Sequence, residues 1–249
     1  EPMVDGFKFF TYNDSESFEN LFTHLEETGP KIAAVLIEPI QGEGGVNVGK
    51  QSFLKLIRNK CSKSNVLLIF DEVQTGMGRT GTLWGYEQFG IEPDVCTLAK
   101  GLGGGHAIGA LLVNQSADIF EPGDHASTFG GNPFACRAAL TVGEEIKRRD
   151  LLTEIKKRGD QLKDGLKNLS KKYSNIIIET RGMGLIQGLV LKDDINLTAL
   201  DIVKAALQEK LLIISAGEKV VRMVPPLTIT KKEINQLLER LDTCLEKLS

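Results

Sequence analysis

The stretch V-L-L-I-F-D-E-V-Q-T-G-M-G-R-T-G, residues 66–81, indicates the fold class of this chain. Residues 65–70 form an apolar run that predicts a buried strand. Asp71 follows the run directly, and a glycine-rich turn closes the stretch at residues 75–81. A carboxylate at the carboxyl end of a strand lies where α/β sheets bind ligands. The alternative for Asp71 is an aspartate that only caps the loop.

Similar apolar runs lie before and after this strand, at residues 31–38, 94–99 and 107–113. Between the first run and residue 65, apolar residues at helical spacing predict a helix over residues 51–64. Short buried strands that alternate with helices are typical of a mostly parallel α/β sheet. We expect residues 1–149 to form this α/β domain.

Residues 150–249 have a different pattern and predict a smaller α+β domain. Helices are expected at residues 132–148, 151–172 and 197–210 and from Thr230 onward, and strands at 176–179, 185–191, 211–215 and 220–224. The T-K-K-E sequence at residues 230–233 fits a capping box, in which two side chains bond the first backbone N–H groups of a helix.

The composition is that of a globular protein, with 41% apolar and 25% charged residues in a chain of 249. A net charge of −3 argues against a nucleic-acid or membrane-surface partner. The apolar runs are far shorter than the roughly 20 residues of a membrane span. Four cysteines without a C-x-x-C pair and three scattered histidines show no metal-ligand spacing. We therefore expect reduced thiols in a cytoplasmic protein.

Lys100 ends the run at residues 94–99 and opens G-L-G-G-G at residues 101–105. A lysine after a buried strand is hard to keep solvated, and a desolvated lysine becomes a nucleophile toward aldehydes. The glycines allow the backbone to approach a bulky ligand closely. A lysine at an exposed strand end is the alternative. No G-x-G-x-x-G follows the strand, which argues against a nicotinamide dinucleotide site.

A strand-end aspartate followed 29 residues later by a strand-end lysine suits pyridoxal phosphate. The cofactor needs a lysine for its aldehyde. It also needs an acid against its ring nitrogen, because the protonated ring is the electron sink. A hydrogen bond between a carboxylate and a pyridinium is charge-assisted and therefore stronger than a neutral one. Asp71 and Lys100 thus predict a pyridoxal-phosphate site.

Three long segments resemble the class III aminotransferases. They are F-D-E-V-Q-T-G-M-G-R-T-G at residues 70–81, L-A-K-G-L-G-G-G at residues 98–105 and H-A-S-T-F-G-G-N-P at residues 125–133. The resemblance runs from about Gly6 to the C-terminus. It implies a pyridoxal-phosphate-dependent transaminase of fold type I. Residues 1–149 would then belong to the large cofactor-binding domain, and residues 150–249 would form the small C-terminal domain.

The resemblance also implies roles for the residues of the first two segments. Lys100 matches the lysine that forms the Schiff base with the cofactor and later moves a proton. Asp71 matches the partner of the ring nitrogen. Val73 is expected to pack on a ring face, and Gln74 is expected to donate to the ring hydroxyl oxygen. Glu72 lies between them in the same motif and is included among the expected cofactor contacts.

Four further roles follow from the resemblance. Thr128 is expected to reach the cofactor phosphate of a neighbouring subunit, and Ser127 to contact substrate at the same boundary, which implies a homodimer. Arg222 is expected to bind the substrate α-carboxylate, and Glu43 to pair with Arg222 when an ω-amino group must reach the cofactor. Without the resemblance, Arg222 would be interpreted as an ordinary surface arginine and Glu43 as a loop charge.

Two more segments, at residues 38–46 and 85–94, favour the branch of the family that transfers the δ-amino group of N-acetylornithine to 2-oxoglutarate. Ornithine, succinylornithine and 4-aminobutyrate remain open as donors. A non-catalytic remnant that serves only as a dimerisation module is the alternative from another class. Intact Lys100, Asp71, Gln74 and Thr128 argue against it.

The family normally has a longer N-terminal part. The resemblance implies that this part supplies a phosphate loop at a helix N-terminus, an aromatic residue that stacks on the ring and an arginine that recognises the acyl group. None of these is found before Gly6. We therefore expect the sequence to be part of a longer enzyme, and this chain to expose apolar surface.

Overall fold

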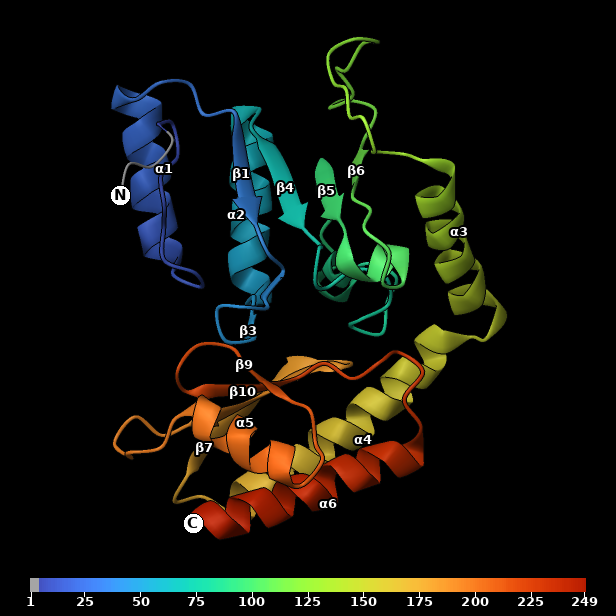
Figure 1. Ribbon diagram of the computed structural model, residues 1–249. Coiled ribbons are helices and arrows are strands. Elements are labelled where there is room, and N and C mark those ends of the chain that lie inside the picture. The colour runs from blue at the N-terminus through green and yellow to red at the C-terminus, as the bar shows by residue number, and fades with distance from the viewer. Residues whose placement is uncertain (1–4) are drawn as a thin grey trace.

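The computed structural model describes residues 5–249 and contains two four-stranded sheets with helices packed against them (Figure 1). The first four residues of the predicted domain 1–149 lie outside the described residues. The first sheet has the spatial order β1 (Ala34–Ile37), β4 (Leu67–Asp71), β5 (Val95–Leu98) and β6 (Ala110–Val113). Strands β1, β4 and β5 are parallel, and β6 is antiparallel to β5. The mostly parallel α/β sheet is confirmed.

One face of this sheet forms the core of the first half. Alternate strand residues such as Val35 and Leu68 pack with the buried stripe of α2 (Gln51–Ser64), as the helical spacing predicted. The opposite face carries Leu36 and Leu111, whose exposed fractions are 56% and 48%. The expectation that this chain exposes apolar surface is confirmed.

Helix α1 (Ser15–Thr28) is not among the helices that we predict from the sequence. Asp14 caps its first turn by accepting a hydrogen bond from the backbone N of Ser17 at 3.0 Å. Phe18 and Phe22, one turn apart, join the aromatic core below the helix. Only these two of its 14 residues are buried, and so sparse a stripe gives little periodic signal.

A short hairpin joins β1 to α2. It pairs β2 (Ile40–Gln41) with β3 (Asn47–Val48), and no periodic pattern marks strands of two residues. Its turn contains Gly45 at φ +113° and Val46 at φ +56°, both in left-handed backbone conformations. The Val46 side chain is fully buried and anchors the turn to the core.

The remaining chain forms the antiparallel sheet β7-β8-β10-β9 and most of the helices. The elements are α3 (Pro133–Arg148), α4 (Leu151–Lys172), β7 (Ile177–Met183), β8 (Ile186–Leu191), α5 (Ala199–Gln208), β9 (Ile214–Ser215), β10 (Val220–Met223) and α6 (Lys231–Leu248). Helices α4, α5 and α6 share one apolar core with this sheet. Thr230 and Glu233 form the predicted capping box. The predicted domain boundary falls in the turn between α3 and α4 and stays a prediction.

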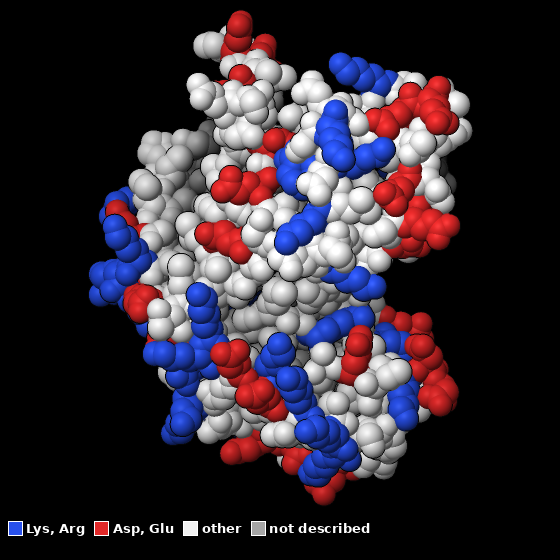
Figure 2. All heavy atoms as spheres, turned by 180° about the vertical axis from the view of Figure 1, so that it is seen from behind, with Lys and Arg blue, Asp and Glu red and all other residues white. Residues whose placement is uncertain are grey.

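Charges of both signs are mixed on the surface of the described chain. Lys and Arg side chains are interspersed with Asp and Glu over the face seen in Figure 2. No helix among residues 5–249 combines the length and the hydropathy needed to cross a bilayer.

Candidate active site

The carboxyl ends of β1, β4 and β5 lie at one edge of the first sheet, because these strands are parallel. Asp71 is the last residue of β4, and Thr97 of β5 is its neighbour in the register. Shortly after Thr97, Lys100 opens the 3₁₀-helix η2 (Lys100–Gly103). The structure therefore brings Asp71 and Lys100 to the same sheet edge.

The Lys100 side chain is exposed in this chain, which corrects the expectation that it would be desolvated. The neighbouring Gly101, Gly104 and Gly105 are exposed as well and have no side chains that could cover it. The Lys100 backbone has φ +40°, a conformation that residues with a Cβ adopt rarely. Such backbone strain tends to occur at functional sites.

Asp71 is half-buried, and its Oδ1 accepts a hydrogen bond from the backbone N of Val73 at 2.9 Å. Asp71 therefore does cap the turn that follows β4, as the alternative interpretation stated. This bond uses one of the two carboxylate oxygens. Capping the turn and binding a ligand are thus compatible roles for the same side chain.

Glu38 is a third ionisable residue at this edge, and we did not single it out from the sequence. It follows β1 directly, and its Oε2 accepts a hydrogen bond from the backbone N of Gly42 at 3.0 Å. Burial raises the pKa of Glu38, and the nearby charge of Asp71 raises it further. The sequence did contain a signal for this residue, a carboxylate that ends an apolar run directly before Pro39.

Arg222 of β10 meets two side chains from the first half of the chain. Its Nη2 lies 2.8 Å from Glu43 Oε1, and its Nη1 donates to Gln74 Oε1 at 3.0 Å. Gln74 Nε2 donates to the same Glu43 oxygen at 2.7 Å. Arg222 is only 4% exposed, so its interpretation as an ordinary surface arginine is wrong. The hydrogen bond from Arg222 holds the pKa of Glu43 below its ordinary value.

Ser127 and Thr128 lie away from these residues. Strand β6 runs opposite to β5, and the loop that follows it extends past the other edge of the sheet (Figure 1). Both residues are exposed, and Ser127 Oγ accepts a hydrogen bond from the backbone N of Gly130 at 2.9 Å. The structure does not bring Ser127 or Thr128 to Lys100 of the same chain.

A known protein family matches almost the whole chain. The family model described as aminotransferase class-III matches residues 1–245. The chain belongs to the class-III aminotransferases. The resemblance carried by residues 70–81, 98–105 and 125–133 is therefore confirmed.

Individual class-III aminotransferases match over most of this chain. The acetylornithine aminotransferase of Prochlorococcus marinus is 60% identical over 249 residues, and the match covers all of this chain and 59% of that protein. The N-acetylornithine aminotransferase of Stenotrophomonas maltophilia superposes with a TM-score of 0.84 at 36% identity, covering 97% of this chain and 62% of the other. The ornithine aminotransferase of Toxoplasma gondii gives 0.90 at 33% identity, covering 100% and 58%. This chain thus spans less than two thirds of the length of these relatives.

The residues at the sheet edge fit the pyridoxal phosphate of class-III aminotransferases. Thr97 Oγ1 is buried without a hydrogen-bond partner among residues 5–249, in register with the half-buried Asp71. An unpartnered buried hydroxyl beside a carboxylate suits a polar ring. Gln74 carries two amide N–H groups, so one remains for a ring hydroxyl while the other bonds Glu43. The individual cofactor contacts of Lys100, Asp71, Val73 and Gln74 stay predictions.

The Glu72 carboxylate has a structural role in this class-III aminotransferase, and its expected cofactor contact stays a prediction. It is 1% exposed, and its Oε2 accepts hydrogen bonds from the backbone N of Gly85 at 2.8 Å and from Thr75 Oγ1 at 2.5 Å. Its Oε1 accepts from the backbone N of Tyr86 at 2.7 Å. The two backbone donors belong to the first turn of the 3₁₀-helix η1 (Gly85–Phe89), so the carboxylate caps that helix.

We expect Glu72→Gln to lower the free energy of unfolding by about 2 kcal/mol, because the amide NH₂ replaces an acceptor that faces a backbone donor. Such a loss lowers the thermal midpoint by roughly 4–8 °C in a domain of this size. Calorimetry of the full-length protein with and without the substitution measures the change. Glu87→Gln at the exposed N-terminal turn of η1 is the matched control and should shift the midpoint by less than half as much. An unchanged midpoint for Glu72→Gln would contradict the capping role.

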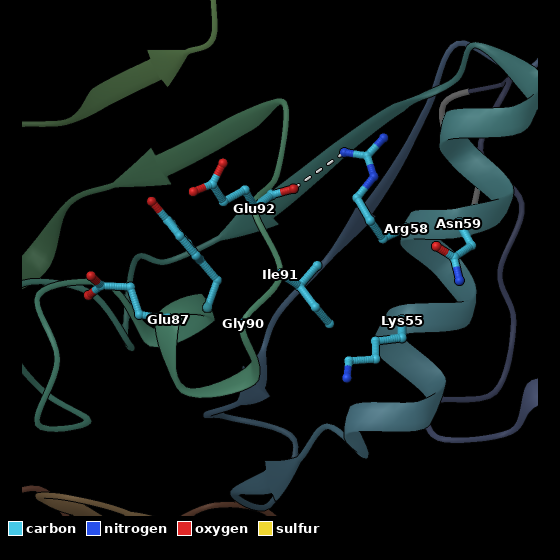
Figure 3. Close-up of a pocket in the computed structure, with 8 residues that line it drawn as sticks. Lys55, Arg58, Asn59, Glu87, Gly90, Ile91 and Glu92 are labelled. Atoms are coloured by element: carbon cyan, nitrogen blue, oxygen red, sulfur yellow. Dashed lines mark hydrogen bonds between the residues drawn. The ribbon is translucent and has the colours of Figure 1, made fainter.

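A surface hollow lies apart from all of the predicted site residues (Figure 3). It is lined by Lys55, Arg58, Asn59, Tyr86, Glu87, Gly90, Ile91 and Glu92. Arg58 points across it to the backbone oxygen of Glu92 at 3.4 Å and forms an ion pair with Asp94 at 2.8 Å. Because these contacts hold Arg58 within the fold, we assign no ligand to the hollow. In the described part of the chain, no three His, Cys, Asp or Glu residues gather as metal ligands would.

Proposed function

We propose that the protein transfers the δ-amino group of N2-acetyl-L-ornithine to 2-oxoglutarate, giving N-acetylglutamate 5-semialdehyde and glutamate in arginine biosynthesis. The observation that carries this proposal is the cluster of Arg222, Glu43 and Gln74 beside the sheet edge that bears Asp71 and Lys100. Relatives named acetylornithine aminotransferase, at 59–61% identity, support the choice of donor.

Four residues of this chain are assigned separate roles toward the cofactor. Pyridoxal phosphate, when bound, supplies an electron-withdrawing ring that stabilises negative charge on the substrate carbon next to the nitrogen. Lys100 would hold the cofactor aldehyde, and its free amine would carry a proton. Asp71 would keep the ring nitrogen protonated through a charge-assisted hydrogen bond. Val73 would pack on one face of the ring, and Gln74 would donate to its hydroxyl oxygen.

The two substrates place different groups next to Arg222. Glutamate and 2-oxoglutarate carry a carboxylate on the reacting carbon, which an arginine binds with two parallel hydrogen bonds. The reacting δ-carbon of N-acetylornithine carries no carboxylate, so the charge of the buried Arg222 needs another partner. Glu43 Oε1, 2.8 Å from Arg222 Nη2, supplies it. Glu43 and the α-carboxylate therefore alternate on Arg222 between the two halves of the reaction.

The proposal includes a homodimer in the cytoplasm. Thr128 would reach the cofactor phosphate of a neighbouring subunit, and Ser127 its substrate. The exposed loop that carries both residues, on the sheet edge away from Lys100, supports this role. The four cysteines are free, which supports a reducing compartment.

Ornithine is the second candidate donor, because the ornithine aminotransferase of Toxoplasma gondii shares the fold closely. Succinylornithine and 4-aminobutyrate use the same chemistry. All of these donors react through a terminal amine, and the Glu43–Arg222 pair serves each of them.

Comparing amino donors on the full-length enzyme tests the proposed function. We expect kcat/KM with N-acetylornithine and 2-oxoglutarate to exceed kcat/KM with ornithine or 4-aminobutyrate by at least about tenfold, which corresponds to about 1.4 kcal/mol of binding in the transition state. Glutamate formation is the measured product in each assay. A higher kcat/KM with ornithine would replace the proposed donor by the second candidate. Absence of turnover with every donor would favour the non-catalytic dimerisation module.

A further inference from the structure

A second arginine holds the hairpin turn that carries Glu43. Arg181 lies on β7, 136 residues away from the turn, and its Nε donates to the backbone oxygen of Gly45 at 2.8 Å. Its Nη1 also forms an ion pair with Glu179 at 3.0 Å. A Cβ on Gly45 would lie 2.9 Å from Arg181 Nη2, so the guanidinium lies directly against the turn. The side chain of Arg181 is therefore committed to this turn and to its neighbour on β7.

The register of the second sheet places Arg181 and Arg222 in one row. Arg222 of β10 is opposite Gly188 of β8, and Gly188 is opposite Arg181 of β7. Residues opposite each other in antiparallel strands project from the same face of the sheet. Both arginines therefore face the hairpin, one on each side of Gly188.

Gly188 has no side chain, and this allows the hairpin to pack closely against β8 between the two arginines. A Cβ at this position would lie 3.3 Å from Val46 Cβ, closer than ordinary contact. The buried Val46 side chain thus rests on the bare backbone of β8. Glu43, on one side of this contact, pairs with Arg222, and Gly45 accepts its hydrogen bond from Arg181 on the other side.

The turn needs stabilising contacts from residues outside it, because its backbone is strained. Gly45 and Val46 follow each other with φ of +113° and +56°, and Val46 has a branched Cβ that disfavours this region. Strained segments persist where surrounding contacts over-determine them. The hydrogen bond from a charged guanidinium to the Gly45 carbonyl is such a contact, and it is stronger than a neutral one.

We propose that Arg181 is a positioning residue that keeps Glu43 on Arg222 and thereby sets the preference of the enzyme between side-chain amines and α-amino acids. The inference rests on the proposed alternation of Glu43 and the α-carboxylate on Arg222. Without Arg181 the turn leaves its strained conformation more often, and Glu43 spends less time on Arg222. An α-carboxylate then meets less competition, whereas a side-chain amine meets an unneutralised arginine.

The test compares kcat/KM for glutamate with kcat/KM for the side-chain amine that the wild-type full-length enzyme prefers. We expect Arg181→Met to raise the ratio of glutamate to that amine about tenfold, and Arg181→Lys to raise it about threefold. Lysine keeps the charge but lacks the planar fork that bonds Gly45 and Glu179 together. Glu179→Gln is the matched control, since it leaves the bond to Gly45 in place, and should change the ratio less than twofold.

A double-substitution cycle separates positioning from a general structural effect. In a Glu43→Gln background, Arg181→Met should change the ratio by less than twofold, because the side chain through which Arg181 acts is already altered. An unchanged ratio in both single Arg181 variants would overturn the proposal, as would a tenfold effect that persists with Glu43→Gln. If Arg181→Met fails to fold, the ratio in Arg181→Lys decides. The ratio is taken with the preferred amine of the wild type, so a donor other than N-acetylornithine would refute the proposed function and leave this test intact.

Discussion

Replacing Lys100 by alanine in the full-length enzyme is expected to reduce kcat by at least about 10³-fold, because we propose that the lysine both attaches the cofactor and carries the proton. The fold should remain, since Lys100 is exposed and alanine has the same backbone preference at φ +40°. A change in unfolding free energy within about 0.5 kcal/mol is expected for such a surface site. Glutamate formation and the thermal midpoint of the same preparation measure the two effects.

Lys55→Ala is the matched control for this experiment. Lys55 is an exposed lysine of α2 and lines the hollow that we leave without a ligand. Its loss should leave kcat within twofold of the wild type. Turnover retained by Lys100→Ala would refute the assignment of Lys100. It would also refute the hypothesis that Asp71 and Lys100 form a pyridoxal-phosphate site.

Asp71→Asn is expected to reduce kcat by about 10²-fold or more and to weaken cofactor binding. A charge-assisted hydrogen bond contributes up to about 3 kcal/mol, and an amide does not keep the ring nitrogen protonated. Asparagine retains an oxygen for the backbone N of Val73, so the turn after β4 is preserved. Turnover is measured as before, and equilibrium dialysis of the full-length protein against pyridoxal phosphate measures the affinity.

The control for Asp71→Asn is Asp118→Asn, an exposed aspartate in the loop after β6 that none of our proposals uses. Both its kcat and its cofactor affinity should match the wild type. Wild-type rates and affinity in Asp71→Asn would mean that another acid serves the ring nitrogen. Glu38, whose carboxylate lies at the same sheet edge, would then be the next residue to replace.

The strands and the residues at their ends were predictable because each signal is short. An apolar run and the polar residue that follows it are neighbours in the chain, so Asp71 and Lys100 could be placed before any tertiary contact was known. The capping box of Thr230 and Glu233 is local in the same way. Helix α1 and the β2–β3 hairpin were missed because two buried phenylalanines and two-residue strands give too little periodicity.

The burial of individual side chains could not be predicted from the local sequence. Glu72 adjoins Asp71 in the chain but turns toward backbone donors of η1, and both of its oxygens are used there. Lys100 was expected to be desolvated, yet the glycines around it leave it exposed in this chain. Neighbours in sequence alternate between the two sides of a strand end, and only the packing shows which side binds a ligand.

Local residue order was sufficient for the α/β class, the mostly parallel sheet and the position of Asp71 and Lys100 at its edge, since the hydrophobic effect acts on patterns a few residues long. Folding of the whole chain was required for the cluster of Glu43, Gln74 and Arg222, to which we assign the choice of donor. Glu43 and Arg222 are 179 residues apart, and Gly45 and Arg181 are 136 apart. A hydrogen bond acts over about 3 Å whatever the separation in sequence. These partners therefore become visible only when the fold brings the β2–β3 hairpin against β7 and β10, which are distant from it in the sequence.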